Sequence, residues 1–318
     1  MVDFDSDIQT LNELIENNDI SKPDYILNGL VKEHIGVLIA APDMGKSHLV
    51  LSLLIEHCSK TKILGLSKVS KPSKAMLISA EDGGEVIKSR MLEKLPHLPR
   101  KVSNLVKSNL IINTSTNSIV ACPEDTIETK TNVENYLSYL ANKIKENDVS
   151  LVVVDTVSEI IGNASEVAND RQIKNAFQKL AKLSGASILL VHHVNKLEIR
   201  GEAEINIASM AGLSSVMRLS KFICTIINGK DDKKVFKYLK ANYISNEEKK
   251  DFNLQFENNL LVNKSVMDLN PIESKEVVGF TDRELAEINK ERKTIILDVS
   301  EPEQDKTEKK PRTRRRTF

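Results

Sequence analysis

The chain has 318 residues, of which 40% are hydrophobic and 28% charged, and its 45 basic side chains are matched by 45 acidic ones. A chain of this length suits one large α/β domain or two small ones with a real core, so disorder throughout is excluded. No apolar run approaches the roughly 20 residues of a membrane helix, and the acidic start is unlike a secretory leader. Three widely spaced cysteines favour neither a disulfide framework nor a zinc site, so we expect a cytoplasmic protein without membrane contact.

Charge is distributed unevenly along the chain. Residues 306–318 contain seven Lys or Arg and one acid, so the remainder is slightly acidic. Zero net charge argues against a protein that is basic over its whole surface, but it permits local basic patches. With no tryptophan and 4% aromatic residues, an aromatic platform for stacked bases is not favoured.

Residues 1–30 are predicted to form an N-terminal helical arm. Leu11, Leu14 and Ile15 have helical spacing, and the SKPDY stretch at 21–25 ends that pattern.

From residue 35 the chain alternates between apolar runs typical of buried strands and longer amphipathic runs typical of helices. Thr131 and Glu134 have the spacing of a capping box, which predicts a helix start. The alternation predicts an α/β fold whose mainly parallel sheet carries helices on both faces. Strands are expected at 35–41, 75–79, 110–113, 151–155 and 187–191, and helices from about 46, over 85–95, from about 131 to 145 and over 171–183.

After residue 220 the pattern changes to short strands separated by turn-rich links, which predicts an antiparallel extension of the sheet. Thr281 and Glu284 predict one more helix, and the rest of 263–318 is a charged extension with a flexible basic tail. The predicted core therefore spans 31–262. Its last strands are expected at 222–227, 235–241, 252–256 and 260–262.

A phosphate-binding loop follows the first core strand. Residues 40–47 match GxxxxGK[ST] except for Ala40, which stands where the motif has its first glycine. In this motif Gly45 lets the backbone approach phosphate, Lys46 reaches the β- and γ-phosphates, and Ser47 binds Mg²⁺. A strand before the loop and a helix after it argue against a chance match. The predicted nucleotide-binding residues are Ala41, Pro42, Asp43, Met44, Gly45, Lys46, Ser47 and His48.

Two later strands end in carboxylates. Asp155 ends the strand at 151–155 as a Walker-B aspartate does, and Glu81 follows the strand at 75–79. Carboxyl ends of parallel strands meet at the ligand-binding edge of such a sheet, where one acid can hold the metal and another can activate water. Asp82 is an equal candidate beside Glu81, and the spacing does not separate them.

A pair of histidines, His192 and His193, follows the strand at 187–191. A polar side chain at that strand end can hydrogen-bond the γ-phosphate and sense its presence. No acid or cysteine has metal-ligand spacing from the pair, so a metal site there is not favoured.

Taken together and in this order, these motifs resemble those of a known protein family. The P-loop, AED at 80–82, VVVDT at 152–156, LLVHHVNK at 189–196 and KYLKANY at 237–243 resemble the RecA-type P-loop ATPases. More narrowly, the chain resembles the RepA-like hexameric replicative helicases of plasmids, over roughly residues 30–262. The Walker motifs are widely shared among ATPases, whereas the ordered combination of the other motifs is more specific.

The resemblance implies a homo-oligomer, usually a hexameric ring, with ATP and Mg²⁺ between subunits and single-stranded DNA in the central channel. By this likeness Glu81 is the catalytic carboxylate and Asp155 the Mg²⁺ partner. Of the two histidines, the likeness favours His193 over His192 as the phosphate sensor, and the residues themselves leave both open.

The resemblance also places basic residues that act on the neighbouring subunit. Arg218 matches the arginine finger, Lys240 resembles a second basic residue sent toward the neighbour's nucleotide, and Arg200 is a competing finger. Residues 194–212 occupy the place of the DNA loops, where Lys196 and Arg200 could meet phosphates despite three nearby glutamates. The alternative is that Arg218 has no catalytic role and is an exposed arginine at the start of a strand.

The expected function is that of a ring-forming, ATP-dependent DNA helicase of plasmid or mobile-element replication, which couples hydrolysis to translocation on single-stranded DNA. One alternative is a RecA-like recombination or repair ATPase that forms filaments. Another is a regulatory ATP switch that binds a protein partner and does not unwind DNA.

Overall fold

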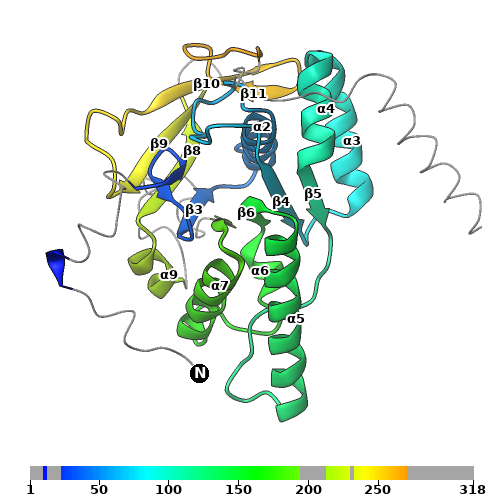
Figure 1. Cartoon of the computed structure of the whole chain (residues 1–318), viewed down its shortest axis with the longest axis vertical. Helices are drawn as coiled ribbons and strands as arrows, with labels where there is room; N and C mark the ends of the chain where they lie inside the picture. Colours follow the sequence, from blue (N-terminus) through cyan, green and yellow to red (C-terminus); the bar gives the residue numbers. More distant parts are fainter. Residues whose placement is uncertain (1–9, 13–22, 194–212, 230–232, 271–318) are drawn as a thin grey trace, which may run out of the picture. The chain divides into compact units, whose positions relative to one another are not determined.

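A nine-stranded sheet forms the centre of the computed structural model, which describes residues 10–12, 23–193, 213–229 and 233–270 (Figure 1). The strand order is β11-β10-β9-β8-β3-β7-β6-β4-β5. The strands are β3 (Ile35–Ala40), β4 (Lys74–Ser79), β5 (Leu110–Asn113), β6 (Val149–Asp155), β7 (Ser187–His193), β8 (Phe222–Asn228), β9 (Lys234–Ala241), β10 (Phe252–Glu257) and β11 (Leu260–Val262).

The parallel part of this sheet includes one strand more than the sequence predicts. The β3–β7, β7–β6, β6–β4 and β4–β5 pairs are parallel, as expected. Strand β8, which was expected to begin the antiparallel extension, pairs parallel with β3 and antiparallel with β9. A parallel strand needs a crossover that returns the chain to the starting end of the sheet, and the stretch 194–221 between β7 and β8 is long enough for one. The antiparallel extension therefore begins at β9.

Helices cover both faces of the sheet, and strand β3 divides its side chains between them. Leu38 and Ala40 belong to the core on one face, whereas Val37 and Ile39 belong to the core on the other. This alternation is the period of two expected of a strand buried on both sides. The first core contains side chains of α2 (Lys46–Ser59), α3 (Gly84–Lys94) and α4 (Arg100–Asn109), and the second contains side chains of α5 (Ile127–Glu146), α6 (Val157–Ile160), α7 (Asp170–Ser184) and α9 (Ser214–Leu219) (Figure 1).

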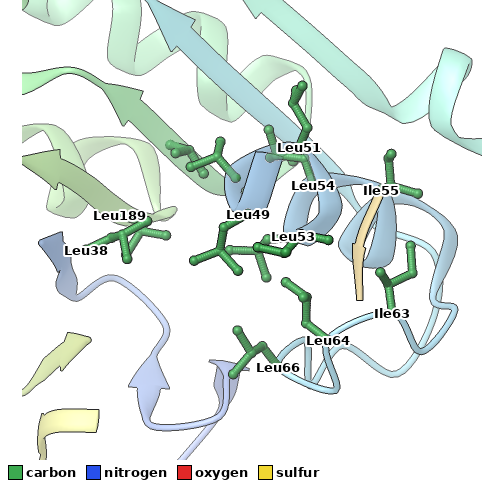
Figure 2. Packing of buried hydrophobic residues seen from close by; sticks show 14 of the residues in the cluster. Leu38, Leu49, Leu51, Leu53, Leu54, Ile55, Ile63, Leu64, Leu66 and Leu189 are labelled. Carbon is green, nitrogen blue, oxygen red and sulfur yellow. The ribbon is translucent and has the colours of Figure 1, made fainter. Parts of the chain in front are cut away.

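Helix α2 is buried on nearly every side, because other segments cover the face that it turns away from the sheet. Leu49 and Leu53 lie between Leu38 of β3 and Leu64 of the loop that follows the helix, and Leu54 lies beside Leu51 on another side of the helix (Figure 2). Its hydrophobic residues consequently run all round the helix instead of forming one stripe, as expected of a fully enclosed helix. The P-loop is thus attached to a helix that the core encloses.

Some local predictions at helix ends are wrong. Helix α5 begins at Ile127, and its N-cap is Thr126, whose hydroxyl accepts a hydrogen bond from the Thr129 amide. Thr131 lies inside this helix and donates its hydroxyl to the carbonyl of Ile127, so it caps nothing. The helix therefore starts more than a turn before the predicted start at about residue 131. Helix α4 was not predicted, although it buries Val102 and Val106.

A two-stranded hairpin, β1 (Tyr25–Leu27) and β2 (Leu30–Val31), replaces the end of the predicted helical arm. Its residues Ile26, Leu27 and Leu30 are buried in the core. The backbones of Lys62 and Asp268 form an isolated antiparallel β-bridge, so ordered structure continues past the predicted core boundary at residue 262.

Other expectations concern parts of the chain beyond the described residues. The chain divides into units Met1–Ile272 and Glu273–Phe318, and all described residues belong to the first. Leu14, Ile15, the helix predicted from Thr281 and Glu284, and the basic tail lie outside the described residues. Within the described ranges no helix is long and apolar enough to cross a membrane.

The end of α2 contains two buried polar side chains. The carboxylate of Glu56 accepts hydrogen bonds from four backbone amides between residues 63 and 67, and this side chain thereby shapes the loop after the helix. The His57 ring contacts the hydroxyls of Ser67 at 3.1 Å and Ser150 at 2.8 Å, and burial lowers the pKa of His57 to about 4.

His57 should make the stability of the protein depend on pH. Because its pKa is lower in the folded than in the unfolded chain, its stabilising contribution is complete above about pH 6.5 and is lost as pH falls toward about 4. Integrated over this pH range, the loss in the free energy of unfolding is about 3 kcal/mol. In urea titrations, the stability difference between wild type and His57→Gln should shrink by that amount between pH 7.5 and pH 4. His97→Gln, at an exposed position, is the control and should leave the pH profile unchanged. Parallel profiles for wild type and His57→Gln would contradict the assignment.

Candidate nucleotide-binding site

The carboxyl ends of β3, β4, β6 and β7 meet at one edge of the sheet, because these four strands run parallel. A cavity of about 510 Å³ lies at this edge. The residues that line it are Ala41, Pro42, Asp43, Gly45, Lys46, Ser47, His48, Glu81, Arg90, His193, Lys234 and Phe256.

The P-loop lies between β3 and α2, as predicted. Gly45 is the N-cap of α2 with φ 86°, a backbone conformation that favours glycine, and it supplies no side-chain cap to the helix. The amides of the first turn are therefore available to an anion, and the helix dipole adds to their attraction. Ala40, the departure from the motif, is the last residue of β3 and pairs with His193 and Ile226. A strand position does not need glycine, which explains why alanine is accepted there.

Lys46 is at the centre of the polar groups in the cavity. Its Nζ lies 3.1 Å from Nε2 of His193 and 4.0 Å from Oδ1 of Asp155. Burial lowers the pKa of Lys46, and the negative charges of Asp155 and Glu81 oppose that shift. Burial, followed by the nearby Lys46 ammonium, also lowers the pKa of His193, so a neutral ring can accept a hydrogen bond from the lysine. Lys46 thus contacts two residues that were predicted from separate motifs.

Asp155 has the surroundings expected of a metal-binding carboxylate. Burial raises its pKa, which the Lys46 charge opposes, and its buried Oδ1 has no hydrogen-bond partner. A buried carboxylate oxygen without a hydrogen bond is costly, and the Lys46 ammonium at 4.0 Å is too far away to donate one. Mg²⁺ prefers oxygen ligands and often keeps waters and substrate phosphates, so Asp155 with the Ser47 hydroxyl fits this ion. Among the described residues no group of three or more His, Cys, Asp or Glu could hold a metal without such outside ligands.

The structure separates the two acids that follow β4. Asp82 forms an ion pair with Arg90 of α3, and its backbone carbonyl accepts a hydrogen bond from the Ser79 hydroxyl. Glu81 lines the cavity and is exposed. Glu81 is consequently the acid that is available to a ligand, whereas Asp82 is occupied by Arg90.

The two histidines of β7 are also separated, because adjacent strand residues point to opposite faces. His193 lines the cavity, whereas Nε2 of His192 lies 3.1 Å from the carboxylate of Glu166. The His192 residue is 6% exposed, and its Nδ1 has no hydrogen-bond partner.

Two of the predicted trans-acting residues, Arg218 and Lys240, are not part of the cavity lining. Arg218 is exposed in the last turn of α9. Lys240 of β9 donates from Nζ to the carbonyls of Met217 at 3.1 Å and Arg218 at 3.4 Å. Burial, with the charge of Lys221, lowers the pKa of Lys240. Lys196 and Arg200 lie outside the described residues.

Three residues that line the cavity were not predicted from the sequence: Arg90, Lys234 and Phe256. Arg90 follows the AED motif by two helical turns, and this spacing is a weak signal that it returns to the same site. Lys234 and Phe256 come from β9 and β10, whose place beside the P-loop depends on the order of strands in the sheet.

The P-loop, the strand-end carboxylate and the mainly parallel sheet with an antiparallel extension define a P-loop ATPase with a RecA-type fold. Residues 6–198 match the family model described as "AAA domain", so the chain belongs to this family. A search of curated proteins finds no match to the sequence.

Two solved structures illustrate the likeness of this fold to known proteins. One is described as an ATPase domain; it is 14% identical with a TM-score of 0.58, and the match covers 82% of this chain and 98% of that chain. The other is a DnaB-like replicative helicase, from a structure that describes its interactions with primase, and it is 13% identical with a TM-score of 0.57. That match covers 83% of this chain and 67% of the helicase chain. At these identities the likeness concerns the fold.

Proposed function

We propose that the protein is a ring-forming, ATP-dependent DNA helicase of the RepA-like type, which acts in the replication of a plasmid or mobile element. The observation that carries the proposal is that Lys46 contacts His193 in the cavity on the P-loop and forms an ion pair with Asp155, which is not itself part of the cavity lining. Residues 31–262 form the ATPase core in this proposal, and the β1–β2 hairpin and residues 263–268 pack on it.

In this proposal ATP and Mg²⁺ are the cofactors. Residues 41–48 bind the phosphates through backbone amides and the Lys46 ammonium, while Ser47 and Asp155 hold Mg²⁺. Bound there, Mg²⁺ would supply positive charge to offset that of the phosphates. Lys46 exchanges its hydrogen bond to His193 for one to the γ-phosphate, so His193 can respond to the presence of that phosphate.

Glu81 is the proposed catalytic carboxylate, which orients and polarises the attacking water. Its support is geometric, since it lines the cavity while Asp82 is paired with Arg90. That ion pair also connects α3 to the AED turn and holds Glu81 at the cavity edge. Arg90 is thus a positioning residue.

Hydrolysis in a ring would be completed by the neighbouring subunit. Arg218 is the proposed arginine finger, with Arg200 as its competitor, because an exposed guanidinium at a fixed helix end can reach another subunit. Lys240 is the proposed second basic residue, and Lys196 and Arg200 are proposed DNA contacts. The basic tail is a further candidate contact with DNA.

Single-stranded DNA should stimulate ATP hydrolysis, and the protein should unwind a forked duplex, because phosphate release is expected to move the DNA loops. Strand displacement on 5′-tailed and 3′-tailed duplexes tests the activity and gives its polarity. Lys46→Ala is the control for contaminating enzymes and should hydrolyse no ATP. Open helical filaments in electron micrographs, without unwinding, would favour the recombination ATPase. Hydrolysis that is indifferent to DNA would favour the regulatory switch.

A further inference from the structure

The β10–β11 hairpin brings an exposed aromatic ring to the P-loop. Phe256 is 50% exposed, and its Cζ lies 3.5 Å from the position that a Cβ on Gly45 would take. Its ring packs edge-to-face on the His48 ring at a centroid distance of 5.1 Å. The exposed part of the ring is available to a flat partner, because aromatic rings stack on nucleobases.

His48 connects this hairpin to the P-loop helix. It lies in the first turn of α2, and its ring is close to the backbone of Asn259 in the hairpin turn. Asn258 and Asn259 form the hairpin turn with φ 50° and 61°, which is the conformation that two-residue hairpin turns require. The amide of Leu261 donates to the Ser52 hydroxyl at 3.1 Å and gives the hairpin a second attachment to α2.

Lys94, at the end of α3, orients the His48 ring. It is a fully buried lysine, 0% exposed, and its Nζ lies 3.3 Å from Nδ1 of His48. An ammonium can only donate, so Nδ1 must accept and the ring proton must be on Nε2. A buried ammonium without a hydrogen bond is costly, and this contact therefore restrains the ring.

We propose that Lys94 and His48 are positioning residues that hold Phe256 at the cavity edge, where its ring stacks on the base of the bound nucleotide. This inference rests on the proposed binding of ATP and deepens it. The phosphates are bound by the P-loop and the base by Phe256, so the two affinities depend on different side chains. Loss of the Lys94 hydrogen bond should therefore affect the base alone.

Calorimetric binding of ATP and of inorganic tripolyphosphate, which has no base, separates the two affinities. Lys94→Met, which keeps the length and apolar contacts of the stem, should raise the Kd for ATP about five- to tenfold. The Kd for tripolyphosphate should stay within about twofold. Phe256→Leu should have the same pattern, and the double variant should lose no more than either single variant if Lys94 acts through Phe256. Lys88→Met, on the exposed face of α3, is the matched control and should bind both probes as wild type does.

An unchanged Kd for ATP in Lys94→Met would overturn the inference, and so would an equal loss for both probes or additive losses in the double variant. If Lys94→Met does not fold, His48→Gln breaks the same connection and is judged by the same ratio of the two Kd values. A wild-type protein that binds neither probe would refute the proposed ATPase itself. Normal wild-type binding with no base-specific loss in the variants refutes this inference alone.

Discussion

Glu81→Gln is expected to lower kcat for ATP hydrolysis about 10³-fold while the protein still binds ATP. Glutamine keeps the size and the hydrogen-bonding capacity of the side chain but removes the negative charge that polarises water. The residue lines the cavity without belonging to the P-loop, so the phosphates should still bind. Steady-state kinetics together with nucleotide binding by fluorescence would measure both effects.

Asp82→Asn is the matched control, since it makes the same chemical change one residue away. It weakens a partly exposed ion pair with Arg90, so we expect a loss of about fivefold or less in kcat. If Asp82→Asn were the more damaging substitution, the assignment of the two acids would have to be reversed.

The second large effect is expected in mixtures of two inactive variants. Arg218→Ala should lower kcat about 10³-fold if its guanidinium stabilises the transferring phosphoryl group in a neighbouring subunit. Mixing Arg218→Ala with Glu81→Gln should restore activity, because roughly a quarter of the interfaces in a random 1:1 ring combine an intact glutamate with an intact arginine. The ATPase rate of the mixture, compared with each variant alone at the same total concentration, measures this recovery.

Arg171→Ala controls for the loss of an exposed arginine near α9, since Arg171 is exposed on the adjoining helix α7. It should keep wild-type activity. A mixture that is no more active than its components would show that each site is complete within one subunit, and Arg218 would then not be a trans-acting finger.

Much of the fold could be predicted because its signals are local. The buried strands at 35–41 and 151–155 appear as continuous apolar runs, and the P-loop is a contiguous motif with a strand before it and a helix after it. The wrong start of α5 and the missed α4 have a local cause as well. Thr131 and Glu134 have the capping-box spacing although they lie inside the helix, and the ten-residue helix α4 buries few apolar side chains.

Most residues of the candidate site could be predicted from the sequence, but the contacts between them could not. Glu81 and Asp82 are equivalent in sequence, and Arg90 separates them only because α3 folds back beside the AED turn. Phe256 could not be predicted, since the strand order that places it beside Gly45 joins segments about 200 residues apart.

By itself, the sequence determined the class of this protein: a mainly parallel sheet with a phosphate-binding loop and acidic and imidazole groups at its strand ends. Those properties follow from backbone periodicity and from motifs of neighbouring residues. Only the tertiary structure decided which acid of the pair Glu81 and Asp82, and which histidine of the pair His192 and His193, is available to a ligand in the cavity. The register that sets Ala40 opposite His193 directs this histidine to the P-loop and leaves His192 with Glu166. In any β-strand the side chains of adjacent residues point to opposite faces of the sheet. The packing of distant segments decides which of the two faces carries the site.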